Sequence, residues 1–148
     1  MKRIAVVKVR GNISVAHSIR DTMAMMNLTR VNHCVVIDDR KQYKGMLQKA
    51  KDYITWGEVS AEMLKKMLAK RGKVTDEAVA GSTKYKTLDE FIGAYLKFEA
   101  EFDEIKTGPV FRLSPPRKGY ASTKKAFGQH GSLGNRREKI NDLLVRMI

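Results

Sequence analysis

The residues that could do chemistry in this 148-residue chain are mainly basic, and they gather at its two ends. Residues 1–58 carry 11 basic and 5 acidic groups, residues 59–105 carry 8 and 9, and residues 106–148 carry 10 and 2. Between Pro109 and Arg137 there is no acidic residue, while seven residues are Lys or Arg. Such a stretch repels itself in addition to losing chain entropy on folding, so we expect it to need a polyanion to lie on. Nucleic acid is the commonest such partner.

Three aromatic residues are spaced among these charges: Phe111, Tyr120 and Phe127. An aromatic ring can stack on an unpaired base, or it can pin the segment to the protein's own core. We expect pinning for Phe111, and both roles stay open for Tyr120 and Phe127. The glycines of the segment suit a close approach of the backbone to RNA, or equally ordinary turns.

The N-terminal part of the chain adds further candidates. Asn12, Ser14 and His17 surround the start of a predicted helix whose amides could hold a phosphate, although an ordinary capped helix start is the simpler explanation. Lys41 and Lys44 follow the polar side of the next predicted helix, which alone is typical of a solvated face. The complete set of predicted RNA-binding residues is Lys2, Arg3, Arg10, Asn12, Ser14, His17, Lys41, Lys44, Arg112, Arg117, Lys118, Tyr120, Lys124, Lys125, Phe127, His130, Arg136 and Arg137.

The sequence offers no pattern typical of an enzyme or a metal site. It has no G-x-x-x-x-G-K-[ST] loop, no G-x-G-x-x-G after a strand and no H-E-x-x-H. The three histidines lack metal-ligand spacing, and the single cysteine, Cys34, makes a zinc site implausible. Asp38 and Asp39 fit a strand end that caps the next helix. We therefore predict no catalytic residue, no metal, no cofactor and no small-molecule substrate.

The hydrophobic pattern predicts the elements that position the basic residues. Residues 1–59 have the order β-α-β-α-β, with Ser14 as the expected N-cap of the first helix and with strands near 4–9, 31–37 and 53–59. Residues 60–105 contain two helices, one capped by Ser60 and ending at Gly72, and one opened by a capping box of Thr87 and Glu90. Residues 106–148 are expected to be irregular until about Arg136, where a final amphipathic helix begins.

Length and targeting signals agree with one small intracellular domain. The chain is long enough for one packed domain with appendages. No run of 18 apolar residues exists, and the N-terminus does not look like a signal peptide. We expect no membrane partner and a cytoplasmic location.

Particular motifs then suggest a family. Residues 1–59 resemble the ribosomal protein L30 family, which is related to the eukaryotic L7 proteins. The resemblance is carried by Ile4-Ala-Val-Val-Lys-Val-Arg10 and by Tyr43-Lys-Gly-Met-Leu-Gln-Lys-Ala-Lys-Asp-Tyr-Ile54, followed by Trp56-Gly-Glu-Val59. Residues 44–50 look like the family's R-G-M-I-N-x-V signature, with Lys44 where the family often has Arg. Phe111-Arg-Leu-Ser-Pro-Pro-Arg-Lys-Gly119 and Gly131-Ser-Leu-Gly-Asn-Arg136 are similar to the longer archaeal and eukaryotic form, and the archaeal form is the better match.

The resemblance implies an α+β fold and a ribosomal function. Residues 1–59 would form a ferredoxin-like β-α-β-α-β core with a three-stranded antiparallel sheet and two helices on one face. A helical segment, 60–105, and a basic extended segment with a C-terminal helix, 106–148, would follow. The protein would be a structural constituent of the large ribosomal subunit, in contact with ribosomal RNA (rRNA) and neighbouring ribosomal proteins. The alternative is a free-standing chromatin or regulatory RNA-binding protein on a ferredoxin-like core.

Overall fold

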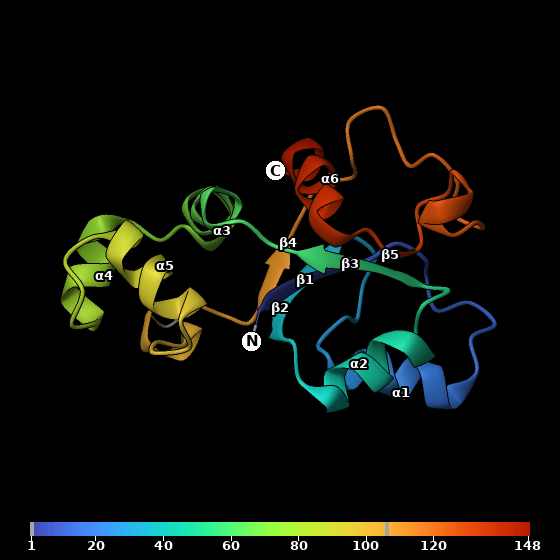
Figure 1. Cartoon of the computed structure of the whole chain (residues 1–148), viewed down its shortest axis with the longest axis horizontal. Helices are drawn as coiled ribbons and strands as arrows, with labels where there is room; N and C mark the ends of the chain where they lie inside the picture. Colours follow the sequence, from blue (N-terminus) through green and yellow to red (C-terminus); the bar gives the residue numbers. More distant parts are fainter. Residues whose placement is uncertain (1, 106) are drawn as a thin grey trace.

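A five-stranded sheet with the order β4-β2-β1-β3-β5 organises the molecule (Figure 1). The computed structural model describes residues 2–105 and 107–148. The central strand β1 (Arg3–Lys8) pairs antiparallel with β2 (His33–Asp38) and with β3 (Ile54–Glu58). At the edges, β4 (Val110–Arg112) pairs antiparallel with β2, and β5 (Gly134–Asn135) pairs parallel with β3.

The sheet therefore has two strands more than the three that the sequence predicted. Both additional strands belong to the C-terminal segment, and they lie at opposite edges of the sheet. They span only three and two residues, too few to leave a period-two pattern in the sequence. Their positions are determined by pairing with distant strands, which local sequence does not reveal.

Helices cover both faces of the sheet (Figure 1). α1 (His17–Met25) and α2 (Lys41–Lys49) lie on one face, and α6 (Ile140–Met147) lies on the other. In β1, Ile4 and Val6 belong to the hydrophobic cluster of α1 and α2, while Ala5 and Val7 belong to the cluster of α6. This two-sided burial explains why β1 is almost continuously apolar.

The start of α1 differs from the prediction. The helix begins at His17, its N-cap position is Ala16, and no side chain caps it. Ser14 has φ of 55°, in the left-handed region, whereas an N-cap residue needs an extended backbone. The expectation that Ser14 caps this helix is therefore wrong.

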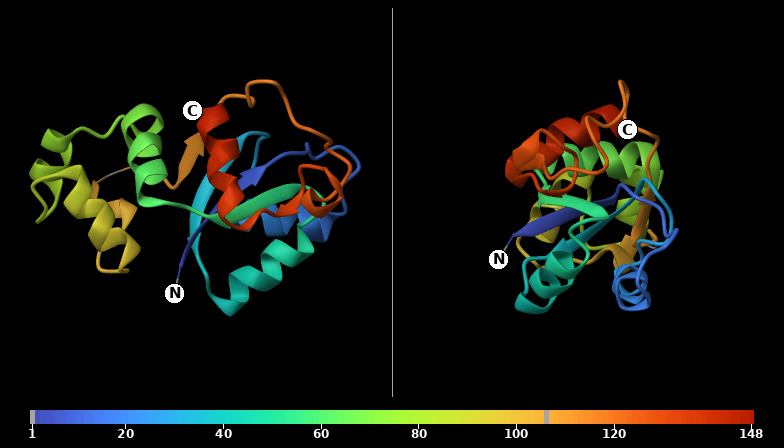
Figure 2. Two further views of the ribbon diagram at one scale, coloured as in Figure 1. Left: turned by 45° about the horizontal axis from the view of Figure 1, so that its top comes forward. Right: turned by 90° about the vertical axis from the view of Figure 1, so that its right-hand side faces the viewer.

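Residues 61–105 form a helical lobe beyond one end of the sheet (Figures 1 and 2). It comprises α3 (Ala61–Met67), a π-helical turn (Leu68–Gly72), α4 (Asp76–Ser82), α5 (Leu88–Leu96) and a 3₁₀ turn (Phe102–Ile105). Tyr95 and Phe102 stack with ring centroids 4.1 Å apart. The lobe's apolar residues belong to the same cluster as the α6 face of the sheet, so lobe and sheet share one core.

The helix caps of the lobe agree only in part with those predicted from the sequence. Ser60 Oγ accepts a hydrogen bond from the Met63 amide at 3.3 Å, which confirms the cap of α3. Thr87 Oγ1 accepts from the Glu90 amide at 3.4 Å, but the Glu90 carboxylate accepts from the Lys86 amide instead of closing the predicted box. At the end of the π-helical turn the left-handed residue is Lys73, one position after the expected glycine.

The C-terminal segment is attached to the core rather than extended away from it. Phe111 is 1% exposed and packs on the core, as expected, and Leu113 and Leu133 are also buried. The predicted final helix is confirmed, because Ile140, Leu143, Leu144 and Met147 of α6 are completely buried. The stretch without acidic residues is thus held to the core by buried apolar side chains, which the charge pattern alone did not predict.

Two glycines allow the C-terminal segment to pack closely against β3 and against its own backbone. A Cβ atom at Gly57 would overlap the carbonyl oxygen of Arg137 and come within 2.8 Å of Ile140 Cβ, so a side chain there would push α6 away from β3. A Cβ atom at Gly131 would overlap the carbonyl of Lys125. The close approach at Gly131 is thus to the protein's own backbone.

Candidate nucleic-acid interface

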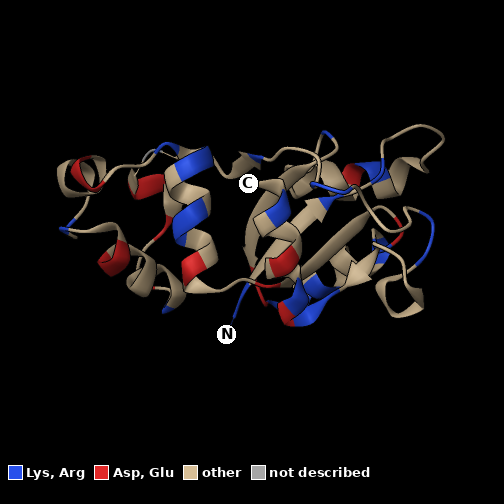
Figure 3. Ribbon diagram, turned by 90° about the horizontal axis from the view of Figure 1, so that it is seen from above, with Lys and Arg blue, Asp and Glu red and all other residues tan. Residues whose placement is uncertain are grey.

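Basic residues of the C-terminal segment lie in and beside the loop that precedes α6, and we call this region the loop surface. Lys118, Lys124, Lys125, His130 and Lys139 are exposed there, and Arg146 is half-buried. Lys118, His130, Lys139 and Arg146 line one hollow of this surface. Two adjoining hollows of about 550 and 570 Å³ lie at this surface and share Phe127 and Lys139 in their linings. None of its lysines is in an ion pair within the described residues. The surface can therefore accept anionic groups. Figure 3, seen from the α6 side, shows that the helical lobe instead carries both signs of charge.

Phe127 and Tyr120 are both held by the protein. The guanidinium of Arg136 lies 4.7 Å from the Phe127 ring centroid, and the Lys139 ammonium lies 5.9 Å from it. Such cation–π contacts help to hold the half-buried ring. Tyr120 OH donates to Asn32 Oδ1 at 2.9 Å, and burial raises the pKa of Tyr120 to about 12. Phe127 lines both hollows of the loop surface, whereas the hydroxyl of Tyr120 is bonded to the core.

Arg136 lies beneath the loop surface, where it holds the loop to the sheet. Its Nε donates to Thr55 Oγ1 at 3.0 Å, and an amino group donates to the carbonyl of Ser132 at 3.1 Å. Desolvation by burial is the main cause that lowers the pKa of Arg136, and the nearby positive charge of Arg146 lowers it further. Because Arg136 is only 8% exposed, it acts as an internal clamp and not as a surface cation.

Arg3 is likewise buried. Its guanidinium pairs with Asp38, donates to the carbonyl of Tyr95 at 3.1 Å, and lies over the rings of Tyr95 and Phe98 at 3.9 and 4.2 Å. Arg3 and Arg136 were included among the predicted RNA-binding residues because they lie in the basic ends of the chain. The structure places both in the interior, so neither belongs to an exposed interface.

The predicted phosphate-binding group around residues 10–17 is not assembled. The Arg10 guanidinium lies 5.1 Å from the Tyr53 ring centroid and donates to the carbonyl of Asp52. Asn12 Oδ1 accepts from Lys8 Nζ at 2.5 Å. His17 Nδ1 lies 2.6 Å from Asp21 Oδ2, and Ser14 is exposed outside the helix. Arg10, Asn12 and His17 thus each contact a different neighbour rather than a shared site.

The remaining predicted cations lie on the surface, but not together. Lys41 and Lys44 are exposed on α2, and Lys2 is exposed beside β3. Arg112 is exposed on β4, at the sheet edge opposite β5, and Arg117 is exposed in the loop that follows β4. The strand order thus separates residues that the sequence groups in one stretch.

Four residues that the structure places at or near these surfaces or in the core were not singled out from the sequence: Lys8, Trp56, Lys139 and Arg146. Lys139 and Arg146 face the hollow at the loop surface, and extending the basic stretch beyond its first acidic residue would have found them. Buried Lys8 donates to the carbonyls of Leu28 and Thr29 at 2.9 and 3.0 Å, and desolvation lowers the pKa of Lys8. Trp56 lines a cleft beside α2, although the strand pattern gave no sign of its exposure.

The fold and its surfaces define an α+β protein that displays cations over α2 and the C-terminal segment. The described residues contain no group of His, Cys, Asp or Glu that could hold a metal ion. No helix in the described part of the chain is long and apolar enough to span a bilayer. Such a protein is suited to binding a polyanion.

Comparison with known proteins identifies the family. A model of the family "Ribosomal protein L30p/L7e" matches residues 4–54. The large ribosomal subunit protein uL30 of Methanopyrus kandleri is 51% identical, over 94% of this chain and 99% of its own length. The uL30 protein of Methanosphaera stadtmanae is 47% identical over 97% of this chain and 99% of its own, and that of Methanobrevibacter smithii is 47% identical over 97% and 98%.

The chain belongs to the uL30 family of ribosomal proteins, in its archaeal form. Membership in this family gives it a structural role and not an enzymatic one.

Proposed function

We propose that this protein is a structural constituent of the large ribosomal subunit, that it binds rRNA there, and that it thereby supports translation in the cytoplasm. The observation that carries the proposal is the loop surface. It belongs to a chain that is a member of a ribosomal protein family. The lysines of this surface are exposed and have no carboxylate partner among the described residues. Such cations can bind phosphate groups and release the counterions of an RNA backbone.

The loop surface would supply most of the electrostatic binding. Lys118, Lys124, Lys125 and Lys139 are flexible point charges, suited to phosphates at several positions along an RNA backbone. Lys41 and Lys44, on the rigid helix α2, would fix the orientation of the protein on the RNA. The finer description of the core, a ferredoxin-like arrangement of β1, β2 and β3 with α1 and α2, belongs to the same proposal.

The helical lobe would face solvent or a neighbouring ribosomal protein. Residues 59–105 carry a net charge of −1, which a phosphate surface would not attract. In the lobe, Lys65 Nζ lies 2.6 Å from Asp89 Oδ2, so part of its positive charge is already compensated. Neighbouring ribosomal proteins are therefore proposed as partners of the lobe, and rRNA as the partner of the loop surface.

Sedimentation of a native cell extract at moderate salt tests this function. The protein should migrate with the large subunit, and little of it should remain at the top of the gradient. A predominantly free pool would contradict the proposal and would favour a free-standing nucleic-acid-binding protein.

A further inference from the structure

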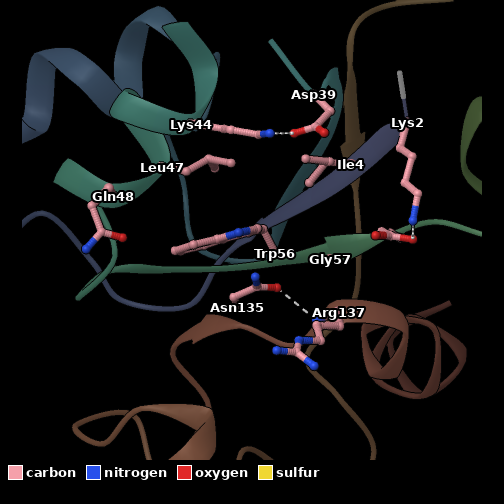
Figure 4. A pocket seen from close by; sticks show the side chains of 11 residues that line it. Lys2, Ile4, Asp39, Lys44, Leu47, Gln48, Trp56, Gly57, Asn135 and Arg137 are labelled. Atoms are coloured by element: carbon pink, nitrogen blue, oxygen red, sulfur yellow. Dashed lines mark hydrogen bonds and ion pairs between the residues drawn. The ribbon is translucent and has the colours of Figure 1, made fainter. Parts of the chain in front are cut away.

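A cleft between α2 and the C-terminal segment holds the only tryptophan of the chain (Figure 4). The cleft has a volume of about 280 Å³, and its lining includes Lys44, Leu47, Gln48, Trp56, Asn135 and Arg137. In Figure 4 the Trp56 indole lies between the side chains of α2 and Asn135. Trp56 is half-buried and packs on the cluster of α1 and α2, and the remainder of its ring faces the cleft.

The backbone around the cleft adopts an unusual conformation. Trp56 and Asn135 are register partners in the β3–β5 pair, and the Arg136 amide donates to the Trp56 carbonyl at 2.8 Å. Arg137 has φ of 51°, and its amide donates to Asn135 Oδ1 at 2.9 Å. A left-handed conformation is costly for a residue other than glycine, and at Arg137 the hydrogen bond to Asn135 Oδ1 accompanies it. This hydrogen bond holds the Asn135 side chain against the Arg137 amide, and both residues line the cleft together with Trp56.

Among the described residues that line the cleft, Arg137 is the one cation without an ion-pair partner. Lys44 Nζ lies 3.0 Å from Asp39 Oδ1, and Lys2 Nζ lies 2.7 Å from Glu58 Oε2. Arg137 is exposed, and its guanidinium has no ion-pair partner within the described residues. The cleft therefore combines an aromatic face and two side-chain amides with a cation at its edge.

We propose that this cleft receives one unpaired nucleotide of rRNA, with its base stacked on Trp56. The inference rests on the proposed function and assigns it a specific contact. Stacking uses the face of a base, while the Gln48 amide can both donate and accept hydrogen bonds along its polar edge. The Asn135 amide nitrogen can donate a further hydrogen bond, because its Oδ1 already accepts from Arg137. Arg137 is suited to the phosphate of the same nucleotide. The cleft, at about 280 Å³, lies at the small end of ligand pockets, which begin at roughly 300 Å³, so it suits a single base with its phosphate outside and not a double helix.

The fluorescence of Trp56, the single tryptophan of the chain, reports directly on occupation of the cleft. The full-length protein is titrated with in vitro transcribed large-subunit rRNA and, separately, with a fully paired RNA duplex at equal phosphate concentration. We expect the rRNA to quench Trp56 fluorescence as it binds, and the duplex to bind without quenching. Unchanged emission at saturation with rRNA, or equal quenching by the duplex, would overturn the proposal.

Matched variants measure the contribution of the cleft to affinity. Loss of a stacking ring should weaken rRNA binding by roughly 5- to 150-fold in Trp56→Ala, while Trp56→Phe should largely restore it. Gln48→Ala, at an exposed position of α2, should weaken binding by about 2- to 13-fold through a lost hydrogen bond. Gln42→Ala changes the same residue type on the same helix outside the cleft and should have no effect.

The outcomes separate this inference from the proposed function. If the protein binds rRNA and sediments with the large subunit, yet Gln48→Ala and Gln42→Ala bind alike, the nucleotide site is wrong and the function stands. If the wild-type protein does not bind rRNA, both are wrong. Gln48→Ala keeps the test decisive even if Trp56→Ala fails to fold, because its side chain is exposed and alanine favours a helix.

Discussion

Neutralising the loop surface should reduce the salt dependence of rRNA binding. We consider a variant in which Lys118, Lys124, Lys125 and Lys139 are all replaced by Gln. Each phosphate neutralised by a cation contributes about 0.9 to the magnitude of the slope of log affinity against log salt on a duplex, and about 0.7 on a single strand. If all four lysines contact phosphates, the slope should fall by roughly 2.8 to 3.6 units. The side chains are exposed, so the fold should persist.

A matched control separates local contacts from total charge. Lys66, Lys70, Lys84 and Lys86 are exposed in or beside the helices of the lobe, and their replacement by Gln removes the same four charges. Both variants fall from a net charge of +13 to +9. Binding to transcribed large-subunit rRNA is measured by fluorescence anisotropy across a salt series. We expect the lobe variant to keep the wild-type slope. Equal losses in the two variants would refute the assignment, because general attraction would then explain the binding.

Three further predictions concern the fold. Gly57→Ala should lower the free energy of unfolding by about 1–3 kcal/mol because its Cβ overlaps the Arg137 carbonyl, and an unchanged urea midpoint would contradict the close approach. Asp38→Asn should cost about 3–5 kcal/mol by leaving Arg3 buried without its charged partner, whereas replacing both residues with apolar ones should cost less in the same assay. Burial, aided by neighbouring cations, lowers the pKa of His33 in the folded protein. The unfolded chain therefore takes up this proton at a higher pH than the folded protein does. The contribution of neutral His33 to the free energy of unfolding should be fully present above about pH 6.5 and should decline as the pH falls below it. The decline should be smaller in His33→Gln, and an identical pH profile would exclude His33 as a cause.

The sequence predicted those parts of the fold that leave a local pattern. The apolar run of β1 and the stripe of Ile140, Leu143 and Leu144 each followed the period of one element, and both were confirmed. β5 could not be predicted, because it comprises two residues that pair with a strand about 80 positions earlier.

The candidate site was harder to predict than the fold. Residue type revealed a basic segment, but not that Arg136 turns inward to Thr55 while nearby Lys139 remains exposed. Burial depends on which distant side chains surround a residue, and a single sequence does not contain that information. For the same reason the cleft at Trp56, formed by four separate segments, had no signal in the sequence.

Crosslinking within native large subunits tests the proposed rRNA interface most directly. Isolated subunits are irradiated with ultraviolet light and digested with nuclease and trypsin, and peptides that carry a nucleotide are identified by mass spectrometry. We expect crosslinked peptides of this protein to come mainly from residues 118–146, which contain the loop surface. Crosslinks arising mainly from residues 61–105 would contradict this interface and would place the helical lobe against the RNA.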